Sequence, residues 1–420
     1  MRMPTLVSAI RRVELMLWLF VTVACVGSGT TVSAAEIRPQ PTEPLTLLRE
    51  RRFTELDALL AKHQQTYEAD PSREADLEHA FQPFHTVENL EPFLSDWIAA
   101  SPTSYVAHLA RGSYYGSRGW DARGEKYINE TPRENIREME RWFEKALADF
   151  ELSLKLTAKP LLSYAGLIGI GQARGWNERK RRWIDEANNV APSNLVARRA
   201  YLVSLRPQWG GSIVEMTAFV ESSAKHLTPD DRRHLESYVW RAKGRVARNR
   251  GDKRTAAQHY TKSLELYDGD GEMYIYRGWM YADLGQQADA LRDFNRGLEI
   301  RPDDAHGYRR RGALLLKMGE YERALDDLNR ALALKPDDAW AWGNRGYVHE
   351  RRGRLEQAFA DYQKAAQRGD AWSQNRLGEY YWHGRATAPN RQQAIHWWKT
   401  AAEKGNRDAQ HHLQNEGRQP

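Results

Sequence analysis

Cysteine is almost absent from this chain. Of its 420 residues only one is cysteine, Cys25, and it lies in the amino-terminal leader. The rest of the chain therefore cannot form a disulfide, bind a metal through thiolates or use a cysteine nucleophile. The stability of the folded part must come from packing. If the leader is removed after Cys25, the mature protein contains no cysteine.

Several other patterns are missing as well. Alternating runs of Val, Ile and Thr are almost absent after residue 35, so β-strands are not expected. The formal net charge is only +6, and Lys and Arg form no long block, which argues against a nucleic-acid partner. The sequence shows no zinc-ligand spacing and no nucleotide-binding motif, so we expect neither a metal nor a cofactor.

The amino terminus has the pattern of an export signal. A basic segment, "MRMPTLVSAIRRVE", precedes about a dozen apolar residues, "LMLWLFVTVACV", which is short for a membrane span. Small residues then predict cleavage near Ala34 or Ala35, with residues 36–43 as a linker. The leading prediction is a soluble periplasmic protein. An uncleaved leader, or a lipid on Cys25 in the lipoprotein-like "TVAC", would instead anchor the chain in the membrane.

Beyond the leader, apolar residues recur every three or four positions, which predicts an all-α protein. Within residues 231–369 a unit repeats at an interval of 34 residues. The interval links two sets of glycines, one of alanines and one of aromatic or leucine residues: Gly251, Gly285, Gly319 and Gly353; Gly244, Gly278, Gly312 and Gly346; Ala256, Ala290, Ala324 and Ala358; Tyr260, Phe294, Leu328 and Tyr362.

These positions resemble the tetratricopeptide repeat, whose clearest copy here is "HGYRRRGALLLKMGEYERALDDLNRALALKP". The resemblance implies four helical hairpins stacked into an α-solenoid that winds as a right-handed superhelix. Residues 370–415, with "LGEYYWHG" and "QAIHWWKTAAEKGNRDAQHHL", resemble the Sel-1-like repeat and would cap the array. The segment "RATAP" after Gly384 departs from that family's pattern, so the loop there is expected to differ.

Residues 44–230 are expected to form a helical domain of degenerate repeats. Gly112 and Ala146 are 34 residues apart, where an intact repeat has 12, and the extra residues predict an inserted loop near 116–137. The domain resembles a bacterial domain of unknown function (4034-type) in "RGWDARG", in "ALADFELSLKL" followed by a proline, and in "RPQWGGS". The family has no activity to carry over. The resemblance does imply a shared design for Trp120, Arg123, Trp209 and Ser212.

The stretch "RPQWGGS" has two interpretations. A phosphate-binding loop would need a preceding strand and a following Gly-Lys-Ser/Thr, and the sequence has neither. The repeat interval instead places the stretch at the turn of a degenerate hairpin. We therefore predict that Gly210 and Gly211 make the turn and that Ser212 caps the next helix.

Candidate chemistry outside the repeats is sparse, and no catalytic residue is assigned. His108, Asp121 and Glu125 could pair as acid and base near the inserted loop, but we favour a solvated loop with salt bridges. Trp120 and Arg123 could stack on a sugar or an aromatic ligand, but we favour a role in pinning the loop. Histidines near the end of the chain are expected to be surface residues and not metal ligands: His383, His396, His411 and His412.

In tetratricopeptide proteins the first helix of each hairpin lines a concave groove, and the resemblance places three residues per hairpin inside it. A groove that is basic at one end and aromatic in the middle would suit an extended acidic peptide. In the alternative, neighbouring side chains of the array fill the groove. The expected groove residues are Arg241, Arg245 and Arg248; Ile275, Trp279 and Ala282; Arg309, Ala313 and Leu316; and Gly343, Tyr347 and Glu350.

The leading functional prediction is a non-enzymatic scaffold of the bacterial cell envelope that binds a protein or peptide in this groove. One alternative is an enzyme whose active site lies around the inserted loop. A third possibility is an adaptor inside the cell, anchored by an uncleaved leader. The sequence contains no recognised catalytic constellation, which favours the scaffold.

Overall fold

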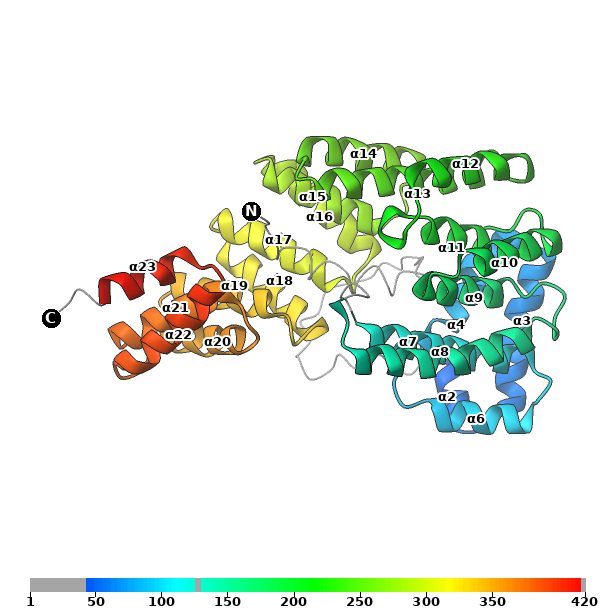
Figure 1. Cartoon of the computed structure of the whole chain (residues 1–420), viewed down its shortest axis with the longest axis horizontal. Coiled ribbons are helices and arrows are strands. Elements are labelled where there is room, and N and C mark those ends of the chain that lie inside the picture. Colours follow the sequence, from blue (N-terminus) through cyan, green and yellow to red (C-terminus); the bar gives the residue numbers. More distant parts are fainter. Residues whose placement is uncertain (1–42, 125–129, 417–420) are drawn as a thin grey trace. The chain divides into compact units, whose positions relative to one another are not determined.

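The computed structural model describes residues 43–124 and 130–416, and every regular element in these ranges is a helix (Figure 1). The predicted all-α class is therefore confirmed. The chain divides into a first compact unit that ends at Asp270 and a second that starts at Gly271. The predicted leader and Glu125 lie outside the described residues.

The first unit has one continuous hydrophobic core that extends from Leu45 to Ala242. Three short 3-10 turns, η3 (Pro71–Arg73), η5 (Pro207–Trp209) and η6 (Ala224–His226), interrupt its helices. The helices are α2 (Glu43–Arg49), α3 (Phe53–Ala69), α4 (Glu74–Phe81), α5 (Pro83–Thr86), α6 (Glu91–Ala100), α7 (Tyr105–Arg123), α8 (Arg133–Ser153), α9 (Leu161–Arg174), α10 (Asn177–Val190), α11 (Val196–Ser204), α12 (Ile213–Ser223), α13 (Pro229–Asn249) and α14 (Lys253–Leu266).

The second unit is a stack of helical hairpins, as the repeats predict. Each first helix packs on the second helix of its own hairpin, and that second helix packs on the first helix of the next hairpin. A final helix packs on α22. The helices are α15 (Gly271–Asp283), α16 (Gln287–Ile300), α17 (Ala305–Lys317), α18 (Tyr321–Leu334), α19 (Ala339–Arg351), α20 (Leu355–Gln367), α21 (Ala371–His383), α22 (Arg391–Glu403) and α23 (Arg407–Glu416).

Glycine is required at the turn inside each hairpin because the backbone there is left-handed. In the α17–α18 hairpin, Gly319 has a φ of 82°. A residue with a β-carbon is strained in this region, and a β-branched residue most of all. The predicted turns at Gly251, Gly285, Gly319 and Gly353 are confirmed.

Replacing Gly319 with Val should therefore destabilise the second unit by about 1–3 kcal/mol. The expected loss comes from backbone strain, since no atom lies within 4 Å of a β-carbon built at this position. The measurement is urea denaturation followed by far-ultraviolet circular dichroism. Gly319→Asn is the matched control, because Asn tolerates the left-handed region, and this variant should lose less stability than Gly319→Val. Equal losses in the two variants would contradict the backbone explanation.

The insertion predicted as a loop near 116–137 is mostly helix, and this expectation is corrected. Helix α7 continues to Arg123 and α8 begins at Arg133, so both are longer than the paired helices α15–α22 of the second unit. The two helices pack together closely (Figure 1). A β-carbon at Gly119 would lie 2.4 Å from the Phe143 ring, so this glycine lets the added turns approach each other. The added helical residues continue the apolar spacing of the two helices, so they lengthen the hairpin.

A bidentate ion pair, the Arg–Asp clasp, joins the two helices of several hairpins. In the α7–α8 hairpin, Arg111 Nε and Nη2 donate to the Asp149 carboxylate at 2.8 and 2.9 Å. The Arg precedes the first-helix glycine and the Asp precedes the aromatic or leucine residue of the second helix. Because the clasp recurs there, α7–α8 is an enlarged copy of the same unit. At 2.7–2.9 Å it also joins Arg277 to Asp293, Arg311 to Asp327 and Arg345 to Asp361.

The stretch "RPQWGGS" forms the predicted turn. Helix α11 ends at Ser204, and Gly210 follows the short η5 turn with a φ of 86°. A β-carbon on Gly211 would lie 2.1 Å from the backbone oxygen of Leu205, so the chain approaches itself too closely for any other residue. The Ser212 hydroxyl accepts the Glu215 N–H at 3.1 Å and caps α12.

Candidate functional site

A groove of about 700 Å³ opens on the second unit, along the first helices of three consecutive hairpins, α17, α19 and α21. Side chains from the turn after α17 complete its wall. Four of the lining residues are ones that the repeat pattern assigned to the inner face. The lining includes Ala313, Leu316, Gly343 and Tyr347.

Several lining residues were missed because only three positions per hairpin were assigned to the groove. On α19 the lining also includes Trp340, Asn344 and Arg351. Together with Tyr347 these residues follow the spacing i, i+4, i+7, i+11, which is one face of a helix. Assigning a second row of positions on the same side of each first helix to the groove would have identified them. Lys317 of α17 and Trp372 of α21 also line the groove and were not predicted.

Aromatic rings form a corner at one side of the groove. The rings of Tyr347 and Trp372 are 5.7 Å apart and nearly perpendicular, at 88°. Trp372 also meets the buried Tyr362 edge-on at 5.6 Å, yet 39% of Trp372 remains exposed. Asn344 Nδ2 donates to the Trp340 backbone oxygen at 2.7 Å. The corner therefore combines fixed rings with an open apolar surface.

Two cations line the same groove. Lys317 and Arg351 lie at the last residues of α17 and α19, at equivalent positions of neighbouring repeats, and both are exposed. Arg351 Nε donates to the Tyr321 hydroxyl at 3.3 Å, and Tyr321 is itself a lining residue. Cations at helix carboxyl ends are stabilised by the helix dipole. Lys317 and Arg351 therefore bring positive charge to the groove at helix ends where the helix dipole stabilises it.

The expectation that Ile275 and Arg309 face the groove is corrected, because both residues are buried. Ile275 is 1% exposed and packs in a core with Phe294 and Leu298. Arg309 is 5% exposed and its Nη1 lies 3.4 Å from Asp338. Burial follows because the hairpins pack more closely than the repeat pattern alone indicates. The neighbouring Arg310, not predicted, lies with its guanidinium 3.5 Å from the centre of the half-buried Trp279 ring.

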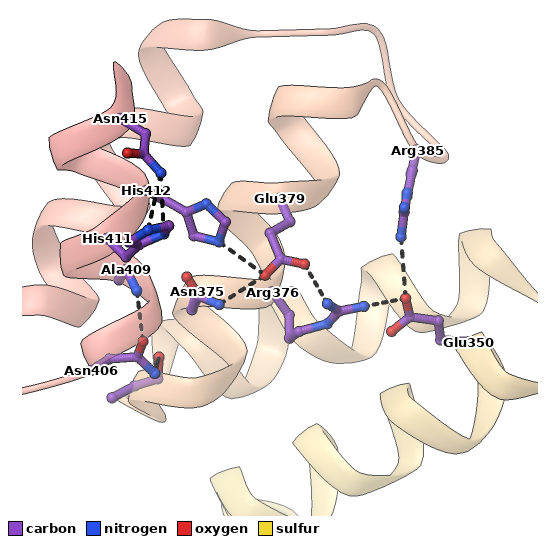
Figure 2. Close-up of polar contacts among 11 residues, drawn as sticks. Glu350, Asn375, Arg376, Glu379, Arg385, Asn406, Ala409, His411, His412 and Asn415 are labelled. Carbon is purple, nitrogen blue, oxygen red and sulfur yellow. Dashed lines mark hydrogen bonds and ion pairs between the residues drawn. The ribbon is translucent and has the colours of Figure 1, made fainter. Parts of the chain in front are cut away.

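The far end of the inner face is occupied by ion pairs (Figure 2). Glu350, predicted to face the groove, accepts the Tyr362 hydroxyl at 2.7 Å and pairs with Arg376. Arg376 also pairs with Glu379, whose Oε1 lies 3.4 Å from His412 Nε2 of α23. Figure 2 shows Arg376 between the two carboxylates. This end of the array is therefore filled by its own side chains, as the alternative interpretation expected.

The three arginines expected at the basic end belong to α13 of the first unit. Arg241 is 8% exposed, and its Nη1 lies 3.2 Å from Asp270 Oδ2. Arg245 is 6% exposed and Arg248 is half-buried. Buried arginines of this kind stabilise the fold through their partners. A role for the three in peptide binding stays a prediction.

The two sequence motifs of the first unit meet in space. Arg123, at the end of α7, lies 5.3 Å from the Trp120 ring and 4.9 Å from the Trp209 ring. The two indole rings are 5.9 Å apart and edge to face. Trp120 also contacts Phe143 of α8, 5.7 Å away. The cluster connects the lengthened α7–α8 hairpin to the turn at Trp209. This arrangement is consistent with the favoured hypothesis that Trp120 and Arg123 hold the inserted segment against its own domain.

Family models match both parts of the chain. The model of a domain of unknown function, DUF4034, matches residues 44–176 and 168–241. Models of the tetratricopeptide repeat match residues 241–305, 314–353 and 341–368. The chain contains a DUF4034 domain and tetratricopeptide repeats. The Sel-1-like assignment of residues 370–415 stays a prediction.

Solved structures match less than half of the chain and at low identity. MamA from Desulfovibrio magneticus RS-1 is 24% identical over 40% of this chain and 93% of its own, with a TM-score of 0.35. YrrB, a TPR protein with an unusual peptide-binding site, is 18% identical over 49% and 100%, with a TM-score of 0.36. Pseudomonas aeruginosa pilF is 17% identical over 42% and 79%, with a TM-score of 0.38. No curated protein matches the chain.

The acid and base candidates of the DUF4034 domain are held in structural contacts. His108 is 3% exposed, with Nδ1 2.9 Å from Asp149 and Nε2 3.1 Å from the Pro102 backbone oxygen. Asp121 pairs with Arg118 at 2.9 Å. In the described ranges no group of three His, Cys, Asp or Glu side chains could hold a metal ion. These contacts favour a structural role for both residues.

The DUF4034 domain also buries a charged cluster that the sequence did not reveal. Arg199 of α11 pairs with both Glu74 and Glu78 of α4, and its Nη2 lies 2.6 Å from Glu78 Oε1. The Val196 N–H donates to Glu74 at 3.0 Å. Burial raises the pKa of Glu74 to about 7, while Arg199 acts to lower it. One guanidinium thus holds two carboxylates and joins α4 to α11, more than 100 residues apart in sequence.

Proposed function

We propose that this protein is a non-enzymatic scaffold that binds an extended segment of a protein partner in the groove of α17, α19 and α21. The observation that carries the proposal is the groove itself, which presents exposed aromatic and cationic side chains from successive repeats. Extended peptides bind such surfaces through a few anchoring side chains. The tetratricopeptide repeats that form it support the same class of function.

The absence of enzymatic activity is part of the proposal. Its support is that His108 and the pair Glu74 and Glu78 serve as partners in contacts between helices, while Asp121 pairs with Arg118 of its own helix. A general acid or base needs access to a substrate proton. Groups fixed between packed helices do not offer that access.

Filling the groove should abolish peptide binding. Ala313→Trp places a bulky ring on the groove wall, where Ala313 is only half-buried. A phage-displayed library of random nonapeptides, selected on the full-length protein, should yield peptides that the wild type retains and the variant loses. Circular dichroism of both proteins establishes that the variant is folded. If every selected peptide binds both proteins equally, the groove is not the binding surface.

We propose an envelope location, with release into the periplasm after cleavage near Ala35. The leader pattern supports this location. Among the described residues, no helix is long and apolar enough to cross a membrane. Mass spectrometry of the native protein should show a new amino terminus near Ala35. An intact Met1 would indicate a membrane anchor, and a diacylglyceryl group on Cys25 a lipoprotein.

A further inference from the structure

We infer that the groove selects a peptide in which a bulky apolar side chain stands about two residues from a carboxylate. The inference rests on the proposed function and names the chemistry of the partner. Two subsites on the groove wall carry it, one aromatic and one cationic, and the positions of Tyr347 and Arg351 on α19 give their spacing.

The aromatic subsite is the corner formed by Tyr347 and Trp372. Trp372 is the one aromatic side chain among the large apolar residues that the described chain leaves exposed. Its ring is fixed from behind by the buried Tyr362, so it is preorganised. A bulky aliphatic or aromatic side chain seated in the corner would bury apolar surface on both rings, which favours binding.

The cationic subsite is the pair Lys317 and Arg351. These side chains extend from equivalent positions at the carboxyl ends of neighbouring first helices, so both positive charges line the groove. Asp370 is the one carboxylate among the described lining residues, and its Oδ2 accepts the Ser373 N–H at 2.7 Å as the cap of α21. The charge of this subsite is therefore complementary to a carboxylate of the ligand.

The spacing follows from α19. Tyr347 and Arg351 are four residues apart on this helix, which is a rise of about 6 Å. An extended peptide advances about 3.3 Å per residue. A side chain in the aromatic corner and a carboxylate at the cationic subsite are therefore about two residues apart along the ligand.

Selection from the random nonapeptide library tests this motif on the full-length protein. The wild type should enrich peptides with a bulky apolar residue and an Asp or Glu two positions away. Lys317→Gln combined with Arg351→Gln should keep the apolar preference and lose the acidic one. The matched control, Arg292→Gln combined with Arg296→Gln, removes two exposed cations of α16 outside this groove and should keep both preferences.

Fluorescence anisotropy then measures the two subsites separately. A synthetic peptide taken from the selection should bind the wild type about tenfold more tightly than its Glu→Gln or Asp→Asn version. The Lys317 and Arg351 double variant should bind the two peptides equally, and added salt should reduce the difference in the wild type. Trp372→Ala should lower the affinity for the apolar residue, with circular dichroism as the test of folding.

The outcomes separate this inference from the proposed function. Peptides that depend on Ala313 but show no acidic preference, or keep one in the Lys317 and Arg351 double variant, overturn the motif and leave peptide binding intact. Failure to find any peptide that depends on Ala313 overturns the proposed function. Binding of a neutral oligosaccharide at Trp372, without peptide binding, overturns both.

Discussion

Replacing Arg199 with Met should destabilise the DUF4034 domain by about 3–5 kcal/mol, because the change leaves two carboxylates buried without their cation. Glu74 and Glu78 are 9% and 3% exposed, and both pair with this one guanidinium. Met keeps most of the side-chain volume, so the loss of stability measures the effect of removing the charge and not the effect of a cavity. Urea denaturation at pH 7, followed by circular dichroism and tryptophan fluorescence, measures it. A loss under about 1 kcal/mol would show that the domain relaxes around the two acids.

Glu74→Gln is the informative control for Arg199→Met. It keeps the pair between Arg199 and Glu78, and Gln can still accept the Val196 N–H. Because the folded-state pKa of Glu74 is about 7, above its ordinary value of 4.5, the folded state binds the proton more tightly. The contribution of Glu74 to stability is therefore full below pH 4.5 and is lost as the pH rises toward 7. The variant should lack that loss and gain stability relative to the wild type over this range.

Replacing Gly211 with Ala should destabilise the DUF4034 domain by about 2–3 kcal/mol. The added β-carbon would lie 2.1 Å from the backbone oxygen of Leu205, and neither of these groups can move without opening the turn. The effect should appear in urea denaturation. It should also appear in near-ultraviolet circular dichroism, since Trp209 and its contact with Trp120 lie at the same turn.

Gly210→Asn is the matched control for this prediction. Gly210 needs a left-handed backbone, with a φ of 86°, but no atom lies within 4 Å of an added β-carbon. Asn tolerates that conformation, so the loss should stay below about 1 kcal/mol. Equal losses at the two glycines would mean that close approach to Leu205 is not what constrains the turn.

The repeat interval predicted the fold because small residues and turn glycines recur at fixed positions. Gly319 and its equivalents determine where each hairpin turns, and the chain confirms them. The insertion was misjudged because its length was counted but its helical spacing was not. Residues such as Gly119 and Phe143 continue the packing of α7 on α8, and this pattern was visible in the sequence.

The candidate site was predictable only in part. The pattern located Tyr347 and Leu316 on the groove, since the inner face of a first helix follows from the repeat. It wrongly placed Ile275 there, because burial depends on how closely neighbouring hairpins pack. The pairing of Glu74 with Arg199 left no local signal at all, since partners more than 100 residues apart meet only in the folded chain.

The Arg–Asp clasp has an evolutionary consequence. Both partners belong to one hairpin, as Arg311 and Asp327 do in α17–α18. Duplication or deletion of a whole hairpin therefore never leaves the buried Asp of a clasp without its counter-ion. The α7–α8 hairpin has gained 22 residues between its glycine and alanine positions and still keeps Arg111 paired with Asp149. The clasp therefore survives as an intact ion pair when its hairpin is copied or enlarged, and removal of the hairpin removes both of its charges together.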